Sequence, residues 1–190
     1  MIDKSIMKKL LLTFLSIAAA YCSLYAQRAV TQERMEQIYE EVKTPYKYGL
    51  AVAPTDNYHK IDCPTVFRQG DKWLMTYVVY NGKTGTDGRG YETWIAESDN
   101  LLDWRTLGRI LSYRDGKWDC NQRGGFPALP DMEWGGSYEL QTYKGRHWMT
   151  YIGGEGTGYE AVKAPLFVGL ASTKGDISTA HEWESLDKPI

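Results

Sequence analysis

Residues 62–77 read Asp-Cys-Pro-Thr-Val-Phe-Arg-Gln-Gly-Asp-Lys-Trp-Leu-Met-Thr-Tyr. The segment 64–68 is short and rich in residues that favour β-structure, and 72–80 is a longer β-branched and aromatic run. The Gly-Asp dipeptide between them is typical of a tight turn. The stretch therefore predicts a strand, a turn and a second strand, with the carboxylate of Asp62 just before the first strand.

Residues 138–151 have the same form as this stretch. They read Tyr-Glu-Leu-Gln-Thr-Tyr-Lys-Gly-Arg-His-Trp-Met-Thr-Tyr, and the Met-Thr-Tyr triplets that begin at Met75 and Met149 are 74 residues apart. Ala96 and Leu170, which begin the triplets Ala-Glu-Ser and Leu-Ala-Ser, keep that offset. A register shared over more than twenty residues indicates an internal repeat.

The repeat predicts two four-stranded antiparallel units. Strands of the first unit are expected at 64–68, 72–80, 91–98 and 104–111. Residues 112–136, rich in Gly, Pro and charge, are expected to connect the units. Strands of the second unit are expected near 138–143, 146–152, 165–172 and 183–190, with Trp104 and Trp183 opening the two last strands.

Units of this size with tryptophans at fixed places are typical of propeller blades. Each blade has an apolar face that only a neighbouring blade can cover. Two blades cannot close a ring, so the fold is expected to be all-β, the truncated N-terminal portion of a longer propeller. The alternative is a two-sheet β domain that is complete in itself.

Residues 1–26 are predicted to be a secretory signal peptide. A basic start is followed by an apolar run, and Ala26 is the small residue before Gln27. A membrane anchor is the alternative, but the apolar run is short for a span, which takes about 20 residues. The mature protein is therefore expected to be secreted or periplasmic and to lack a membrane span.

Residues 27–54 are expected to form an N-terminal helix and a lead-in to the propeller blades at 55–190. Within 31–43, apolar residues recur at the spacing of one helix face, namely Met35, Ile38, Tyr39 and Val42. This stripe is expected to pack against the main domain. Alternatively, the helix crosses to a second subunit and forms a homo-oligomer.

The composition bounds the partners and cofactors. The formal net charge of −2 argues against nucleic acid as a partner. The histidines are scattered, so no metal site and no cofactor are expected, although a divalent ion on the propeller axis is left open. Cys63 and Cys120 could pair in an oxidising compartment or stay free thiols. An excess of Trp and Tyr suits a site that stacks on sugar rings.

Three segments together resemble a known group of enzymes. Asp62-Cys63-Pro64 precedes a strand, a glycine turn and an aromatic strand. Residues 96–104 read Ala-Glu-Ser-Asp-Asn-Leu-Leu-Asp-Trp, similar to a recurring Ser-x-Asp-x-x-x-Trp blade segment, and 134–139 read Trp-Gly-Gly-Ser-Tyr-Glu. In this order they resemble the five-bladed β-propeller glycoside hydrolases, the group around families 43, 32, 62, 117 and 130.

The resemblance covers about residues 55–190 and departs from the family pattern in three ways. Cys63 separates Asp62 from Pro64, where the family has Asp directly before Pro. Glu139 stands where family 43 has a second-blade Asp. The general acid of family 43 lies on a third blade, which the chain lacks. The chain alone is therefore expected to be inactive.

The resemblance implies hydrolysis of glycosidic bonds in oligosaccharides or polysaccharides by paired carboxyl groups, with inversion. Asp62 is the candidate base and Glu139 the carboxylate that tunes it, with Asp131 as a rival for that role. Expected substrate-binding residues are Trp134, by stacking, and His59 and Arg123, by polar contacts. The plainer alternatives are a turn-capping Asp62, a solvent-facing Glu139 and a surface His59.

Two other functions fit the same pattern. One is a non-catalytic propeller that binds carbohydrate, and the other is a structural β domain on the cell surface. The first would keep affinity for saccharides without turnover, and the second would have neither.

Overall fold

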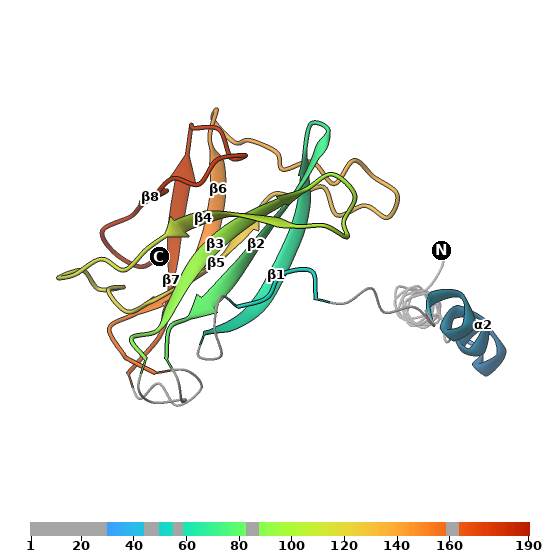
Figure 1. The fold of residues 1–190 in the computed structure, drawn as a ribbon, viewed down its shortest axis with the longest axis horizontal. Helices are drawn as coiled ribbons and strands as arrows, with labels where there is room; N and C mark the ends of the chain where they lie inside the picture. The colour runs from blue at the N-terminus through green and yellow to red at the C-terminus, as the bar shows by residue number, and fades with distance from the viewer. Residues whose placement is uncertain (1–29, 44–49, 55–58, 83–87, 159–163) are drawn as a thin grey trace, which may run out of the picture. The chain divides into compact units, whose positions relative to one another are not determined.

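The computed structural model describes residues 30–43, 50–54, 59–82, 88–158 and 164–190. The signal peptide predicted for residues 1–26 lies outside these residues. The chain divides into two units, Met1–Lys47 and Tyr48–Ile190. The second unit consists of two four-stranded antiparallel sheets (Figure 1). The predicted all-β fold with two repeated units is confirmed.

The first unit contains one described helix, α2 (Gln32–Val42). Thr31 caps it, because its side chain accepts a hydrogen bond from the Arg34 N–H. No residue of α2 is buried. Whether its apolar stripe packs on the main domain or on a second subunit stays a prediction. No helix in the described part of the chain has the length and apolar character needed to cross a membrane.

The first sheet has the order β1-β2-β3-β4. Its strands are β1 (Lys60–Gln69), β2 (Lys72–Tyr80), β3 (Tyr91–Ser98) and β4 (Arg105–Leu111). All four predicted strands are present, and β1 begins four residues earlier than expected. The register of β1 shifts between Asp62 and Thr65, where Cys63 adopts a φ of 52°. This bulge, and the edge position of β1, accommodate Pro64, which cannot donate a ladder hydrogen bond.

The second sheet has the order β5-β6-β7-β8. Its strands are β5 (Gln122–Ala128), β6 (His147–Gly154), β7 (Phe167–Thr173) and β8 (Glu184–Ser185). The prediction of a first strand at 138–143 is wrong, because β5 takes that place from within the expected connection 112–136. The last strand is also far shorter than the predicted 183–190.

Two glycines explain why β5 was not expected. Gly124 and Gly125 give the segment the composition of a loop, but in the structure they allow close packing. A Cβ atom on Gly125 would lie 2.5 Å from Met149 Sδ and 3.0 Å from Leu111 Cδ1. The glycine therefore lets β5 lie closely between its own sheet and the first one.

The internal repeat is confirmed in the strand register. Thr106 pairs with Ala96 in the first sheet, and Ser185 pairs with Ala171 in the second. The residues before them that open the last strands, Trp104 and Trp183, are therefore equivalent, as the sequence predicts.

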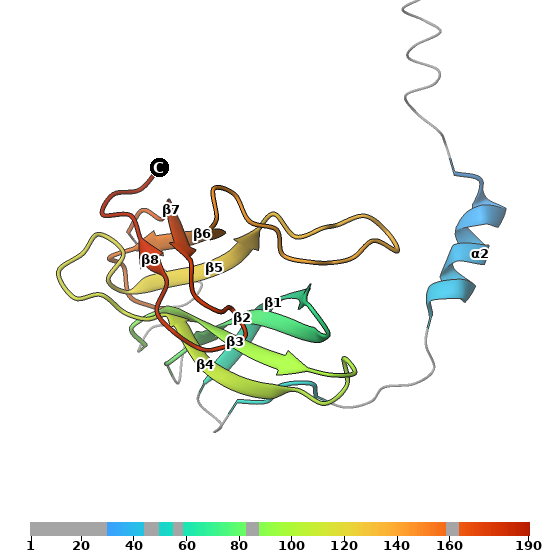
Figure 2. The same ribbon diagram turned by 90° about the horizontal axis from the view of Figure 1, so that it is seen from above.

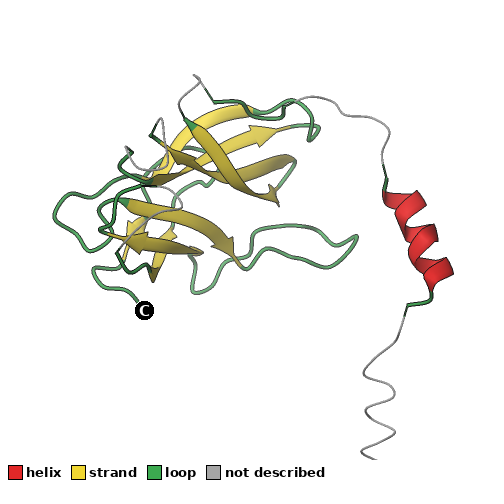
Figure 3. Ribbon diagram, turned by 90° about the horizontal axis from the view of Figure 1, so that it is seen from below, coloured by secondary structure: helices red, strands yellow, loops and turns green. Residues whose placement is uncertain are grey.

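The main core lies between the two sheets, which pack as layers in Figure 2. Both sheets contribute buried apolar side chains, among them Phe67, Leu74, Ile95, Leu111, Met149 and Tyr151. A second cluster covers the other face of the first sheet and contains Met75, Tyr77, Val79 and Ala96. The strands, seen from below in Figure 3, form no third layer among the described residues.

The segment predicted as the strand 138–143 instead joins the two sheets. Glu139 forms a parallel bridge with Arg68 at the end of β1. The Arg68 N–H donates to the Tyr138 carbonyl at 2.7 Å, and the Leu140 N–H donates to the Arg68 carbonyl at 3.2 Å. This segment therefore extends the edge of the first sheet rather than starting the second.

Candidate active site

The two sheets share one end at which several strand termini meet a pocket. β1 and β5 begin there, and β2 and β6 finish there. The pocket has a volume of about 170 Å³ and is lined by Cys63, Val78, Tyr91, Gln122, Gly124, Phe126, Ile152 and Leu166. Most of these side chains are apolar. We call this end of the sheets the Asp62 end.

Asp62 lies in the β1 bulge at the rim of the pocket. Its register partner Val78 and its neighbour Cys63 both line the pocket. The Cys63 N–H donates to Asp62 Oδ1 at 2.7 Å. The Asp62 side chain is exposed, so a ligand can reach it. Of the three predicted catalytic residues, Asp62 is the one that the structure places beside a pocket.

Glu139 and Asp62 are not brought together. The Gly70 N–H, in the turn between β1 and β2, donates to Glu139 Oε1 at 3.1 Å. The eight residues from Asp62 to Gly70 span roughly 20–25 Å of strand. Paired carboxyl groups of glycosidases lie within about 10 Å of each other. The predicted pairing of Glu139 with Asp62 therefore fails on distance.

Asp131 also lies away from the Asp62 end, beside Glu139. Its N–H donates to the Glu139 carbonyl at 3.0 Å. Its carboxylate organises the loop that follows β5, because it accepts hydrogen bonds from the Ser137 hydroxyl at 2.6 Å and the Ser137 N–H at 2.7 Å. These bonds lower the pKa of Asp131. The geometry fits a loop cap better than a catalytic acid or base.

The predicted substrate-binding residues lie in three different places. Trp134 belongs to the loop with Asp131 and is 99% exposed. His59 lines a separate pocket of about 220 Å³ on the far face of the first sheet, with Tyr77 and Trp94. That face is opposite to Val78, the partner of Asp62. Neither Trp134 nor His59 therefore faces the pocket beside Asp62.

Arg123 is fully buried and cannot contact a substrate, which corrects its predicted role. Its guanidinium donates to Glu182 Oε1 at 2.6 Å, to the Ser185 hydroxyl and to the Ser112 carbonyl. Its Nε lies 3.1 Å from Asp119 Oδ2. No sequence pattern indicates that this charge is internal, because Glu182 and Ser185 come from distant positions in the chain.

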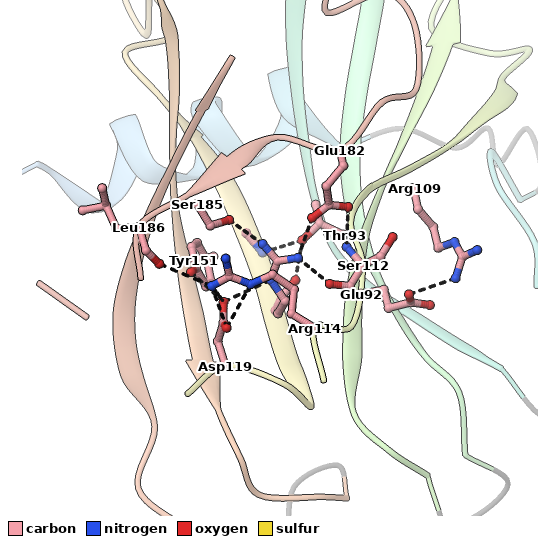
Figure 4. A network of polar contacts seen from close by, with 12 residues as sticks. Glu92, Thr93, Arg109, Ser112, Arg114, Asp119, Tyr151, Glu182, Ser185 and Leu186 are labelled. Atoms are coloured by element: carbon pink, nitrogen blue, oxygen red, sulfur yellow. Dashed lines mark hydrogen bonds and ion pairs between the residues drawn. The ribbon is translucent and has the colours of Figure 1, made fainter. Parts of the chain in front are cut away.

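Figure 4 shows the polar network around this arginine. Asp119, which is also fully buried, accepts hydrogen bonds from Arg114 and from the Tyr151 hydroxyl, the latter at 2.7 Å. Burial and the adjacent Asp119 raise the pKa of Tyr151 to about 12. The network thus fixes the chain on the approach to β5 and holds the start of that strand in place.

Two residues at the Asp62 end were not predicted. Gln122 lines the pocket, and its amide donates to the Gly156 and Gly158 carbonyls, both at 2.9 Å. Glu155 follows β6, and its carbonyl accepts a hydrogen bond from Asn121 Nδ2 at 2.6 Å. The alternation of Gln122, Gly124 and Phe126 on one face is the signal that could have indicated strand β5.

The described residues hold no group of three His, Cys, Asp or Glu side chains arranged to bind a metal ion. Cys63 and Cys120 are both free thiols. Burial and the neighbouring Asp62 raise the pKa of the Cys63 thiol. The chemistry that the Asp62 end offers is therefore that of an exposed carboxylate beside a small apolar pocket.

Comparison with solved structures gives two close matches. A structure named glycoside hydrolase is 99% identical to the chain, covers 85% of it and has a TM-score of 0.79. The predicted resemblance to the glycoside hydrolases is confirmed. A second structure, of BT0996 and named as an RGII complex, matches with the same identity, coverage and TM-score. The chain spans about half of each of these two solved proteins, 46% of their length.

A more distant likeness is to Zg3597, a family 117 glycoside hydrolase produced by the marine bacterium Zobellia galactanivorans. It is 13% identical, with a TM-score of 0.48, and the match covers 68% of this chain and 38% of that one. No protein-family model matches the chain, and no curated protein does.

Proposed function

We propose that the chain forms part of a secreted glycoside hydrolase that cleaves glycosidic bonds in oligosaccharides or polysaccharides. The observation that supports this most is the 99% identity to a solved structure named glycoside hydrolase. The pocket beside Asp62 supports it independently, because an exposed carboxylate next to an apolar wall suits a sugar ring and an attacking water.

Asp62 is the proposed general base. In an inverting mechanism it would take a proton from the water that attacks the anomeric carbon. Glu155 replaces Glu139 as the proposed second carboxylate on this chain, since its backbone is held at the Asp62 end by Asn121. The general acid is expected in the half of the longer enzyme that this chain does not span.

The substrate class is a carbohydrate, and the first candidate comes from a relative. The second solved structure is named as an RGII complex. We propose RGII as the first saccharide to test on this protein. Stereochemistry decides the mechanism, because proton NMR of the fresh product would show the opposite anomer for inversion and the same anomer for retention.

Localisation is proposed from the sequence alone. Cleavage after Ala26 would release a secreted or periplasmic protein that begins at Gln27. Mass spectrometry of the protein recovered outside the cytoplasm is expected to show Gln27 as the first residue. An intact N-terminus would contradict the signal peptide.

The base is tested by Asp62→Asn in the longer, 99% identical glycoside hydrolase. The substitution keeps the shape of the side chain but removes the proton acceptor, so kcat should fall by about 10²–10⁴-fold. Asp71→Asn, in the turn at the other end of β1, is the matched control and should keep full activity. Full activity of the Asp62 variant would overturn the proposed role.

A second pair of variants compares the two carboxylates. Glu155→Gln is expected to lower kcat by at least tenfold, since it would remove charge at the Asp62 end. Glu139→Gln is expected to leave kcat within about twofold, because Glu139 lies at the other end of β1. The reverse result would restore the pairing that the sequence predicted.

A further inference from the structure

The loop between β5 and β6, residues 129–146, presents an indole to solvent. Trp134 is 99% exposed, and Met132 in the same loop is 76% exposed. In Figure 2 this loop projects beyond the end of β5. We call it the Trp134 loop. A tryptophan with almost no protein contact forgoes the apolar burial that this side chain otherwise contributes to a fold.

The Trp134 loop is held by its own hydrogen bonds. Asp131 accepts from Ser137 through both the backbone N–H and the hydroxyl, and from the Glu133 N–H at 3.2 Å. The Gly135 N–H donates to the Tyr138 hydroxyl at 3.0 Å. Because these bonds enclose Trp134 in sequence, the tip is ordered before any ligand arrives.

The first sheet also anchors the base of the loop. Glu139 accepts a hydrogen bond from the Gly70 N–H, and the ring of Tyr138 lies 5.9 Å from that of Trp73, centre to centre. The backbone of Arg68 adds two further hydrogen bonds. Preorganisation of this kind lowers the entropic cost of binding.

The position of Trp134 separates it from the proposed catalytic pocket. The anchor at Gly70 is roughly 20–25 Å along β1 from Asp62. Trp134 and the pocket therefore cannot contact the same sugar ring. They could contact different rings of one long saccharide, or two separate saccharide molecules.

We propose that Trp134 is the stacking platform of a second saccharide-binding site, remote from the Asp62 pocket. The flat indole packs against the apolar face of a sugar ring, and its Nε1–H can donate to a hydroxyl. Gly135 and Gly136 follow Trp134, so no side chain from these two residues covers the ring. The Glu133 carboxylate, its neighbour, is an acceptor for sugar hydroxyls.

A saccharide fits this feature better than a protein partner does. Stable protein interfaces bury about 800 Å² on each partner around a desolvated centre. A single projecting indole flanked by glycines and carboxylates offers no such centre. This inference rests on the proposed function for its ligand class, since a polymeric substrate would supply the second ring.

The test uses Trp134→Ala and Trp134→Phe in the longer glycoside hydrolase, with Tyr39→Ala as control. Tyr39 is an exposed aromatic outside the loop, 63% exposed. Affinity for RGII is measured by calorimetry in the Asp62→Asn background, which prevents turnover. We expect about tenfold weaker binding of RGII for Trp134→Ala, and near-native binding for Trp134→Phe and for the control.

A short substrate separates the two sites. For a chromogenic monosaccharide glycoside, kcat/KM should be unchanged by Trp134→Ala, because a single ring fills the Asp62 pocket alone. Loss of that activity would contradict a separate site. Unchanged affinity for RGII in Trp134→Ala would overturn the proposal, and so would a fall in thermal stability, which would indicate a packing contact.

The two proposals fail in different ways. Hydrolysis without Trp134-dependent binding would leave the enzyme proposal intact and remove the second site. Trp134-dependent binding without hydrolysis by the enzyme with native Asp62 would keep the second site and remove the catalytic function. Absence of both would remove both.

Discussion

The two sheets have the same strand order but are closed by different means. The last strand of the first sheet, β4, has seven residues, whereas the last strand of the second, β8, has two. Behind β8, Arg123 bonds to Glu182 and Ser185, the two residues that flank and form this short strand. The comparison teaches that a buried guanidinium can hold a strand whose backbone ladder is short.

The same arginine also connects the sheets. The Thr93 hydroxyl on β3 donates to the Arg123 carbonyl at 2.7 Å and accepts from the Gly125 N–H at 2.8 Å. The first sheet thus depends on apolar packing and regular pairing, and the second on specific polar bonds. Substitutions in the second sheet should therefore be the more damaging ones.

The largest effect is expected from Arg123→Ala. It would leave Asp119 buried without this partner, which costs about 3–5 kcal/mol of unfolding free energy. Arg105→Ala on β4 is the matched control in the first sheet, because its bond to Glu97 is at the surface, with Arg105 71% exposed. The control should lose about 1 kcal/mol or less. Urea denaturation of both variants measures the difference, and equal losses would break the comparison.

Gly125→Ala is expected to rank second. The new methyl group would need Met149 and Leu111 to shift within the core, at a cost of about 1–3 kcal/mol. The neighbouring Gly124→Ala is the control, because its nearest atom, Val78 Cγ1, is 3.3 Å away. Thermal unfolding should show the larger loss at Gly125. A silent Gly125→Ala would mean that β5 does not need its close approach.

The first sheet was predictable from sequence because its strands follow one another with turns between them. β5 was not, since Gly124 and Gly125 lower strand propensity and their role depends on Met149, which is distant in sequence. The Asp62 site was predictable in part, because a carboxylate before an inner strand lies at a sheet end. Glu139 misled because strand-like composition does not reveal which strand it pairs with.

The third prediction concerns pH and Tyr151. Its pKa is raised to about 12 by burial and by Asp119, above the unfolded value of about 10. The neutral phenol therefore contributes stability fully below pH 10, and this contribution is lost as the pH rises towards 12. Urea denaturation between pH 9 and 12 should show a loss of about 1 kcal/mol from this residue.

Tyr151→Phe serves as the control for this alkaline effect. The variant cannot ionise, so its stability should fall less over the same pH range. Tyr113, whose pKa is also raised by burial, remains in the variant and would account for a residual slope. Identical pH profiles for the two proteins would contradict the role of Tyr151.

The smallest effect is expected from Glu139→Ala. It removes the side-chain bond to Gly70 but keeps the backbone bonds of Arg68, so the loss should be about 0.5–1 kcal/mol. Hydrogen exchange at the Gly70 amide should accelerate, while the Gln122 amide serves as an unaffected reference. Unchanged exchange at Gly70 would show that the backbone bridge alone holds the loop.

The β1 bulge has a further consequence for self-association. β1 is an edge strand, and edge strands with free backbone groups invite pairing between molecules. Here Cys63 breaks the register, Pro64 lacks an N–H, and Arg68 is already bonded by Tyr138 and Leu140. The interruption that positions Asp62 thus also shortens the template that a foreign strand could use, and protects the sheet from aggregation.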